Sequence, residues 1–227
     1  MKVRPLTART KGFAFDGDLA DWGDPAAFQK IGADGSFDAA WDADGLLLAW
    51  SGKGGTANNS QDWRYLFKTG FCVDFSLRTE PSASGEAVAR GDRRVVIGRH
   101  QGKWVAVLHD FVLPDGAGKE AVEYTSPVTS TGVDRVVLLP DSAVKIAVKE
   151  GGGAWSVEAR IAWSALGIAP ADGLKIRADA GILTPDSAGL QVDRRTNWAD
   201  PDVGHVADLA IEAQIHPANF GAWILQP

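Results

Sequence analysis

The sequence predicts an all-β protein, an antiparallel β-sandwich of two packed sheets with at most one or two short helical turns. Three observations support this: most periodic segments alternate apolar and polar residues, turns rich in Gly, Pro and Asp separate them, and only one segment has a helical pattern. Many short strands joined by such turns are typical of sandwiches and barrels. With 227 residues the chain can bury a full core, so we expect one domain spanning 1–227.

The first element we expect is the acidic turn Phe15–Trp22 (Phe-Asp-Gly-Asp-Leu-Ala-Asp-Trp). Asp16 has a side chain that can bond its own backbone, and Gly17 can adopt a positive φ, which are two properties a tight turn requires. Leu19 and Trp22 follow three residues apart. We expect them to cap the open end of a hydrophobic core.

Two segments have the pattern of β-hairpins. In the first, Ala143–Glu150 alternates apolar and charged residues, three glycines turn the chain, and 155–161 alternates again. The second joins Arg94–Arg99 to Trp104–His109 through a turn at 100–103. Trp163–Leu166 is the only expected helical turn, ended by a glycine. The other expected strands are Ser36–Trp41, Leu46–Ser51, Phe71–Leu77, Val122–Thr125, Val136–Leu139, Lys175–Ile182, Gln191–Trp198 and Asp208–Ala213.

Composition excludes several classes of partner. The net charge of −6 argues against a nucleic-acid backbone or an anionic membrane surface as partner, because both require a basic protein surface. No apolar run is long enough to insert into a bilayer. Residues 1–5 lack the apolar core of a signal peptide, which fits a cytoplasmic protein, a mature chain or an excised domain. A lone cysteine, Cys72, excludes an intramolecular disulfide.

Familiar catalytic signatures are missing. Residues 52–56 (Gly-Lys-Gly-Gly-Thr) have the wrong spacing for a phosphate loop and no helix follows. Ser164 lacks the Gly-x-Ser-x-Gly elbow. The four histidines have no metal-ligand spacing: His100, His109, His205 and His216. A carboxylate pair for glycoside hydrolysis remains open, because two acids need only meet in space. The sequence therefore favours a protein that is not an enzyme.

Tryptophans in polar loops are the strongest functional signal. Trp63 ends the long Gly/Asn/Ser loop that starts at Gly52, and Trp198 lies in Arg-Thr-Asn-Trp-Ala-Asp-Pro. A flat indole can stack on the C–H face of a sugar ring while nearby polar groups bond its hydroxyls. For both residues the alternative is a ring that plugs the end of the sandwich. The remaining strand tryptophans are expected in the core: Trp41, Trp50, Trp104 and Trp155.

Five short segments, in order and spacing, resemble the family 9 carbohydrate-binding modules, most closely an uncharacterised branch of bacterial relatives. The segments are Phe15–Trp22, Ala40–Trp50, Gly70–Phe75, Trp155–Trp163 and Asn197–Pro201. The resemblance implies a β-sandwich, usually with structural calcium, that binds a sugar chain between two tryptophans. It also implies a secreted or cell-surface location and attachment to a larger enzyme or surface protein that is brought to a polysaccharide.

Carried onto this sequence, the resemblance implies that Trp198 and Trp63 stack on the sugar. Asp74 and Arg94 match acidic and basic sugar-binding positions, and we expect Asn197 to add hydrogen bonds. The expected ligand is a polysaccharide or oligosaccharide.

Calcium is a secondary hypothesis. Three pairs of aspartates two residues apart can ligate a hard cation: Asp16 and Asp18, Asp42 and Asp44, and Asp200 and Asp202. The alternative is that these are solvated turn acids. Two other functions stay open. One is a structural or interaction domain without its own ligand, and the other is a haem domain, which would need a His–His pair.

Overall fold

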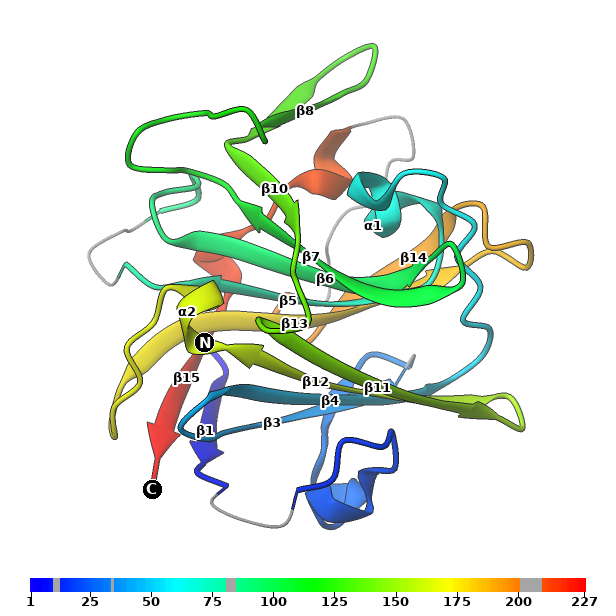
Figure 1. Cartoon of the computed structure of the whole chain (residues 1–227), viewed down its shortest axis with the longest axis vertical. Helices are drawn as coiled ribbons and strands as arrows, with labels where there is room; N and C mark the ends of the chain where they lie inside the picture. The colour runs from blue at the N-terminus through cyan, green and yellow to red at the C-terminus, as the bar shows by residue number, and fades with distance from the viewer. Residues whose placement is uncertain (10–12, 34, 81–84, 201–209) are drawn as a thin grey trace.

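The computed structural model describes residues 1–9, 13–33, 35–80, 85–200 and 210–227. Two β-sheets pack face to face as a sandwich, and short helical segments lie at its margins (Figure 1). The predicted fold class is confirmed. None of the helices in the described part of the chain is long and apolar enough to span a bilayer.

The larger sheet has eight strands in the order β1-β15-β13-β5-β6-β7-β10, with β14 also paired to β13. Every pair is antiparallel except β1 with β15, which places the two ends of the chain side by side. The strands are β1 (Val3–Thr7), β5 (Cys72–Arg78), β6 (Asp92–His100), β7 (Lys103–Asp110), β10 (Arg135–Leu138), β13 (Lys175–Pro185), β14 (Val192–Asn197) and β15 (Gly221–Gln226).

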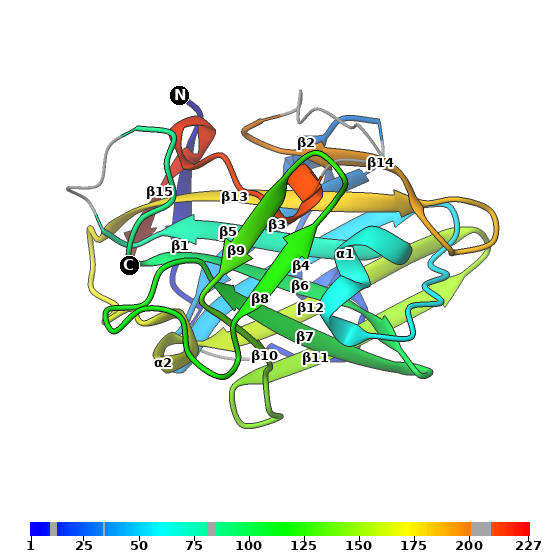
Figure 2. The ribbon, with the colours of Figure 1, turned by 90° about the horizontal axis from the view of Figure 1, so that it is seen from above.

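The smaller sheet has five antiparallel strands in the order β11-β12-β4-β3-β2. They are β2 (Gln29–Ile31), β3 (Gly35–Trp41), β4 (Gly45–Lys53), β11 (Val144–Gly151) and β12 (Ala154–Ala162). A separate hairpin of β8 (Val122–Thr125) and β9 (Ser130–Val133) lies over the outer face of the larger sheet, as Figure 2 shows. The helical segments are η1 (Leu19–Trp22), η2 (Pro25–Ala27), η3 (Trp63–Tyr65), α1 (Leu66–Thr69), α2 (Trp163–Leu166), η4 (Ala210–Ala213) and η5 (Pro217–Asn219).

The main core fills the space between the sheets because alternate strand residues point inward. On β5 the inward residues are Val73, Phe75 and Leu77, and they meet side chains such as Trp50 from β4. Removing each such side chain from water contributes about 1.5–3 kcal/mol. The intervening β5 residues, Asp74 among them, therefore face outward from the sandwich.

The Phe15–Trp22 segment has a different place from the one expected. Trp22 is buried, but it packs with Phe28 on the outer face of the smaller sheet rather than capping the main core. Glu158 of β12 anchors the turn, since it accepts hydrogen bonds from the Trp22 Nε1 (2.9 Å) and from the backbone N–H of Asp16 and Gly17. Glu158 therefore fixes the turn to the outer face of the smaller sheet, and we call this contact the clamp.

Most predicted strands are confirmed, including both hairpins and the helical turn α2. The β6–β7 turn has positive φ at Gln101 (48°) and Gly102 (79°), as a two-residue hairpin loop requires. The strand expected over Asp208–Ala213 is wrong: residues 210–213 form η4, and residues 208 and 209 lie outside the described ranges. Four strands have no counterpart among the expected ones: the short β2 and β9, and β1 and β15, which the chain ends form.

Candidate functional site

The outer face of the larger sheet brings Asp74, Arg94 and Asn197 together. Asp74 of β5 lies opposite Gly181 of β13, and Gly181 lies opposite Asn197 of β14, so three adjacent strands place these residues in one row. Any Cβ atom at Gly181 would overlap the Asp74 carboxylate and the Asn197 amide oxygen. The glycine therefore gives both side chains the space in which they meet.

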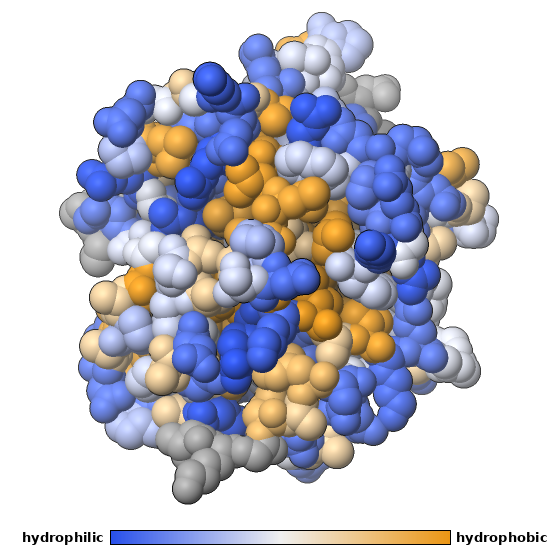
Figure 3. Space-filling model, viewed as in Figure 1, coloured by the Kyte–Doolittle hydropathy of each residue, from blue (hydrophilic) through white to orange (hydrophobic). Residues whose placement is uncertain are grey.

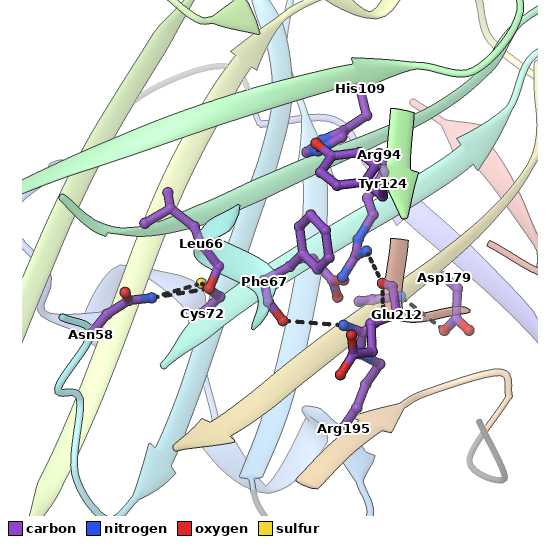
Figure 4. Close-up of polar contacts among 12 residues, drawn as sticks. Asn58, Leu66, Phe67, Cys72, Arg94, His109, Tyr124, Asp179, Arg195 and Glu212 are labelled. Carbon is purple, nitrogen blue, oxygen red and sulfur yellow. Dashed lines mark hydrogen bonds and ion pairs between the residues drawn. The ribbon is translucent and has the colours of Figure 1, made fainter. Parts of the chain in front are cut away.

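A buried ion pair fixes the next side of the row. The Arg94 Nε and Nη2 lie 2.7 and 2.5 Å from Asp74 Oδ2, and the Arg94 side chain is only 2% exposed. Arg94 Nη1 and Arg195 Nη1 both donate to the Glu212 carbonyl oxygen, and Arg195 also donates to the Phe67 carbonyl (Figure 4). Burial, and after it the positive charge of Arg94, lower the pKa of Arg195 to about 9.

Asp179 positions the chain where it leaves β14. Its carboxylate is buried and accepts the backbone N–H of Ala180 (2.8 Å), Ala199 (2.7 Å) and Asp200 (3.2 Å). Burial raises the pKa of Asp179 to about 7, against the lowering effect of these hydrogen bonds. Because residues 199 and 200 directly follow Asn197 and Trp198, the carboxyl of Asp179 holds one wall of the site.

Asp74, Arg94 and Asn197 line the inner end of an open cleft. The inner pocket has a volume of about 20 Å³, room for about one water molecule. Gln214, Ile215 and His216 line both this pocket and an adjoining hollow of about 440 Å³. The hollow is bounded by Glu86–Val88, Phe111 and β9. We call the pocket and hollow together the polar cleft.

Two features of the polar cleft bear on binding. Within the described residues, the buried amide oxygen of Asn197 has no hydrogen-bond partner. One wall is held rigidly, because the buried Arg78 pairs with Asp92 and also donates to the carbonyls of Gly85 and Ala87. A cleft with an unsatisfied acceptor at its end and a fixed wall is suited to a polar ligand.

Trp198 lies in the core. Its ring is 3% exposed and packs edge-on against Phe37 and Trp223, at centroid distances of 5.6 and 6.2 Å. The ring of Trp198 is therefore covered and has no face free to stack on a sugar. It fills the core, as in the alternative considered for this residue. Strand periodicity explains this position of Trp198. Neighbouring strand residues point to opposite faces of a sheet, so Trp198 points inward because Asn197 points outward.

Trp63 lies in a separate groove. Its half-buried ring shares a groove of about 360 Å³ with Arg64, residues 119–122 and Val136–Leu138. Among the described residues, none lines both this groove and the polar cleft. The structure thus unites Asp74, Arg94 and Asn197, and it places both tryptophans elsewhere.

The acidic pairs serve turns and ion pairs. Asp16 accepts the N–H of Asp18, and Asp18 caps η1 and pairs with Lys149 at 2.7 Å. Asp42 accepts the N–H of residues 44 and 45, and Arg160 lies 2.7 Å from Asp42 and 3.6 Å from Asp44. In the part of the chain that the structure describes, no three His, Cys, Asp or Glu residues cluster as a metal site. Lys149 and Arg160 already neutralise the carboxylates of Asp18, Asp42 and Asp44, so these pairs do not fit calcium. Asp202 lies outside the described residues.

The cleft also contains residues outside the set expected from the sequence, among them Arg195, Gln214 and His216. Arg195 was detectable, because it lies two positions before Asn197 and strand periodicity puts both on one face. Gln214 and His216 come from the segment after η4, and no local pattern predicts its return to the sheet. His109 lies beneath the β8–β9 hairpin, where burial lowers its pKa to about 3 and its Nε2 is 3.1 Å from Tyr124 Oη.

Comparison with known proteins gives the fold a name. No protein-family model matches the sequence, and no curated protein is significantly similar to it. A family 9 carbohydrate-binding module from Caldicellulosiruptor kristjanssonii, solved in complex with cellotriose, superposes with a TM-score of 0.58, covering 99% of this chain and 94% of that one at 15% identity. The chain has the fold of a family 9 carbohydrate-binding module.

Two further structures agree with this assignment. The same kind of module from Caldicellulosiruptor kristjanssonii in complex with glucose gives a TM-score of 0.56 at 15% identity, covering 98% of this chain and 96% of that one. A proposed carbohydrate-binding protein from Bacteroides uniformis gives 0.56 at 14% identity, covering 99% of both chains. At this level of identity the likeness to family 9 modules concerns the fold, which spans nearly the whole chain.

Proposed function

We propose that this protein is a non-catalytic carbohydrate-binding module and that the polar cleft is its sugar-binding site. The observation that carries the proposal is the row of Asp74, Gly181 and Asn197 beside Arg94, at the inner end of an open hollow. A carboxylate, an amide and a guanidinium meet there at fixed positions. The 440 Å³ hollow is within the range of small-molecule sites, about 300–1,000 Å³.

The chemistry of the cleft suits sugar hydroxyls, which both donate and accept. The Asn197 amide oxygen would accept a hydroxyl proton, which removes the cost of a buried unpaired acceptor. Asp74 would accept a second, and Gln214 and His216 line the entrance to the inner pocket. Because Arg94 is already held by Asp74 and the Glu212 carbonyl, little side-chain freedom is lost on binding.

In this proposal the module brings a larger enzyme or surface protein to polysaccharide. A site with a few polar contacts is expected to bind with a Kd of about micromolar to millimolar, roughly −4 to −8 kcal/mol. Weak binding at each site suits a targeting role, since several contacts along a polymer can act together. The likeness to modules solved with cellotriose and glucose makes β-linked glucose oligomers the first ligands to try.

A glycan array followed by calorimetry on the best ligands tests the proposal. Asn197→Ala should weaken binding about tenfold, because it removes the acceptor at the end of the cleft. Asn59→Ala is the matched control, since Asn59 is an asparagine in a different loop bonded to the Ala188 carbonyl. Equal affinity of wild type and Asn197→Ala would contradict the site. Absence of any glycan ligand would favour a structural or interaction domain.

A further inference from the structure

The β8–β9 hairpin lies between two hollows on the outer face of the larger sheet. Ser130–Gly132 of β9 bound the hollow of the polar cleft, and Val122 of β8 lines the groove that contains Trp63. Tyr124 holds the hairpin between them. Its Oη donates to the Arg64 carbonyl (3.0 Å), and its ring packs edge-on against Phe67. Figure 2 shows the hairpin crossing the sheet with α1 to one side.

Trp63 is the first residue of the capped helical turn η3. Asp62 caps η3 by accepting the backbone N–H of Arg64 at 3.0 Å, and its carboxylate also pairs with the Arg64 guanidinium at 2.6 Å. Arg64 in turn lies 5.8 Å from the centre of the Trp63 ring. An aromatic ring held in this way contributes contact area at little conformational cost.

The lining of this groove combines apolar and polar groups, as a sugar with its C–H faces and hydroxyls requires. Val122, Val137 and Leu138 provide apolar contact, and Leu138 is 39% exposed. Figure 3 shows hydrophobic residues gathered in a band across the middle of the face that carries β10. Lys119 and Glu120, both exposed, line the same groove and can bond hydroxyls. Its volume of about 360 Å³ is again in the range of ligand sites.

We infer that the Trp63 groove is a second saccharide subsite, separate from the polar cleft, so that a long sugar chain is held on both sides of the β8–β9 hairpin. This inference rests on the proposed function. Engagement of the second subsite by a chain already bound at the first is intramolecular, which raises affinity without any new contact at the first. Affinity should therefore rise with chain length until the oligomer spans the hairpin.

Calorimetry with cellobiose, cellotriose and cellohexaose, or the same lengths of the best array ligand, tests this. The wild type should bind the longest oligomer about tenfold or more tighter than the shortest. Trp63→Ala should lose that gain and leave the affinity for the shortest oligomer unchanged. Trp104→Ala, which removes a half-buried tryptophan outside both hollows, should keep the gain.

The outcomes separate this inference from the proposed function. Trp63→Ala with wild-type affinity at every length would overturn the second subsite, while the effect of Asn197→Ala would leave the polar cleft standing. Conversely, if Asn197→Ala has no effect but Trp63→Ala weakens binding at every length, the polar cleft is wrong and the two-subsite arrangement with it. The indole N–H signal of Trp63 in an NMR titration, assigned with Trp63→Phe, gives a direct readout: it should shift with the longest oligomer.

Discussion

Replacing Asp179 by asparagine should change how stability depends on pH. The buried carboxyl has a pKa of about 7 in the folded protein, raised chiefly by burial, against an ordinary value of 3.8. The folded state therefore binds this proton more tightly than the unfolded state. The contribution of Asp179 to stability is complete below about pH 4 and is lost as the pH rises through 7.

The size of the effect follows from those two values. The pKa of Asp179 is about 7 in the folded protein and 3.8 in the unfolded one, and this difference changes the free energy of unfolding by about 4 kcal/mol between pH 4 and pH 8. His109 acts in the opposite direction over part of this range: its lowered pKa, about 3, means that its contribution is lost as the pH falls below 6.5. Because both proteins contain His109, its effect cancels in the difference between wild type and Asp179→Asn.

Urea unfolding of both proteins at several pH values between 4 and 8 measures this difference. The free energy of unfolding of the wild type, relative to Asp179→Asn, should fall by about 4 kcal/mol as the pH rises over that range. The asparagine variant also replaces an acceptor of the Asp200 N–H, which should lower its stability by a pH-independent amount. Parallel profiles of unfolding free energy against pH for the two proteins would refute the reasoning. They would mean that Asp179 has the same pKa in the folded and the unfolded protein.

Three other substitutions test the fold and the site. Gly181→Ala should displace the Asp74 carboxylate and the Asn197 amide and weaken sugar binding about tenfold or more; calorimetry with unchanged affinity would show that their placement is irrelevant. Glu158→Gln should cost about 1–3 kcal/mol, because an amide cannot accept all three N–H donors of the Trp22 turn, and a thermal melt equal to wild type would contradict the clamp. Trp198→Ala should lower the free energy of unfolding by about 3–5 kcal/mol as a core deletion; unchanged stability in urea would instead argue for an exposed ring.

The fold could be predicted because its signals are local. Alternation over Ala143–Glu150, and the glycine-containing turn at 100–103 between two strand-like segments, each predict a hairpin without reference to the rest of the chain. The β1–β15 pair could not be found in this way. It joins the two ends of the chain in parallel, and its pattern is too short to stand out.

The site was predictable only in part. The family resemblance implies Asp74 and Arg94, and Asn197 is expected as a polar neighbour of Trp198; strand register explains why the three meet. The same periodicity, applied to Asn197 and Trp198, could have shown that both cannot face one cleft. The position of Trp63 depends on how a long loop folds over the sheet edge, which no spacing in the sequence reveals.

The most direct test of the account is an NMR titration of the protein with its best array ligand, following backbone and side-chain amides. If the polar cleft is the sugar site, the largest shifts should come from Gly181, the Asn197 side-chain amide and Gln214, with small changes on the smaller sheet. Shifts confined to β11 and β12, with the Asn197 amide unmoved at saturation, would contradict it.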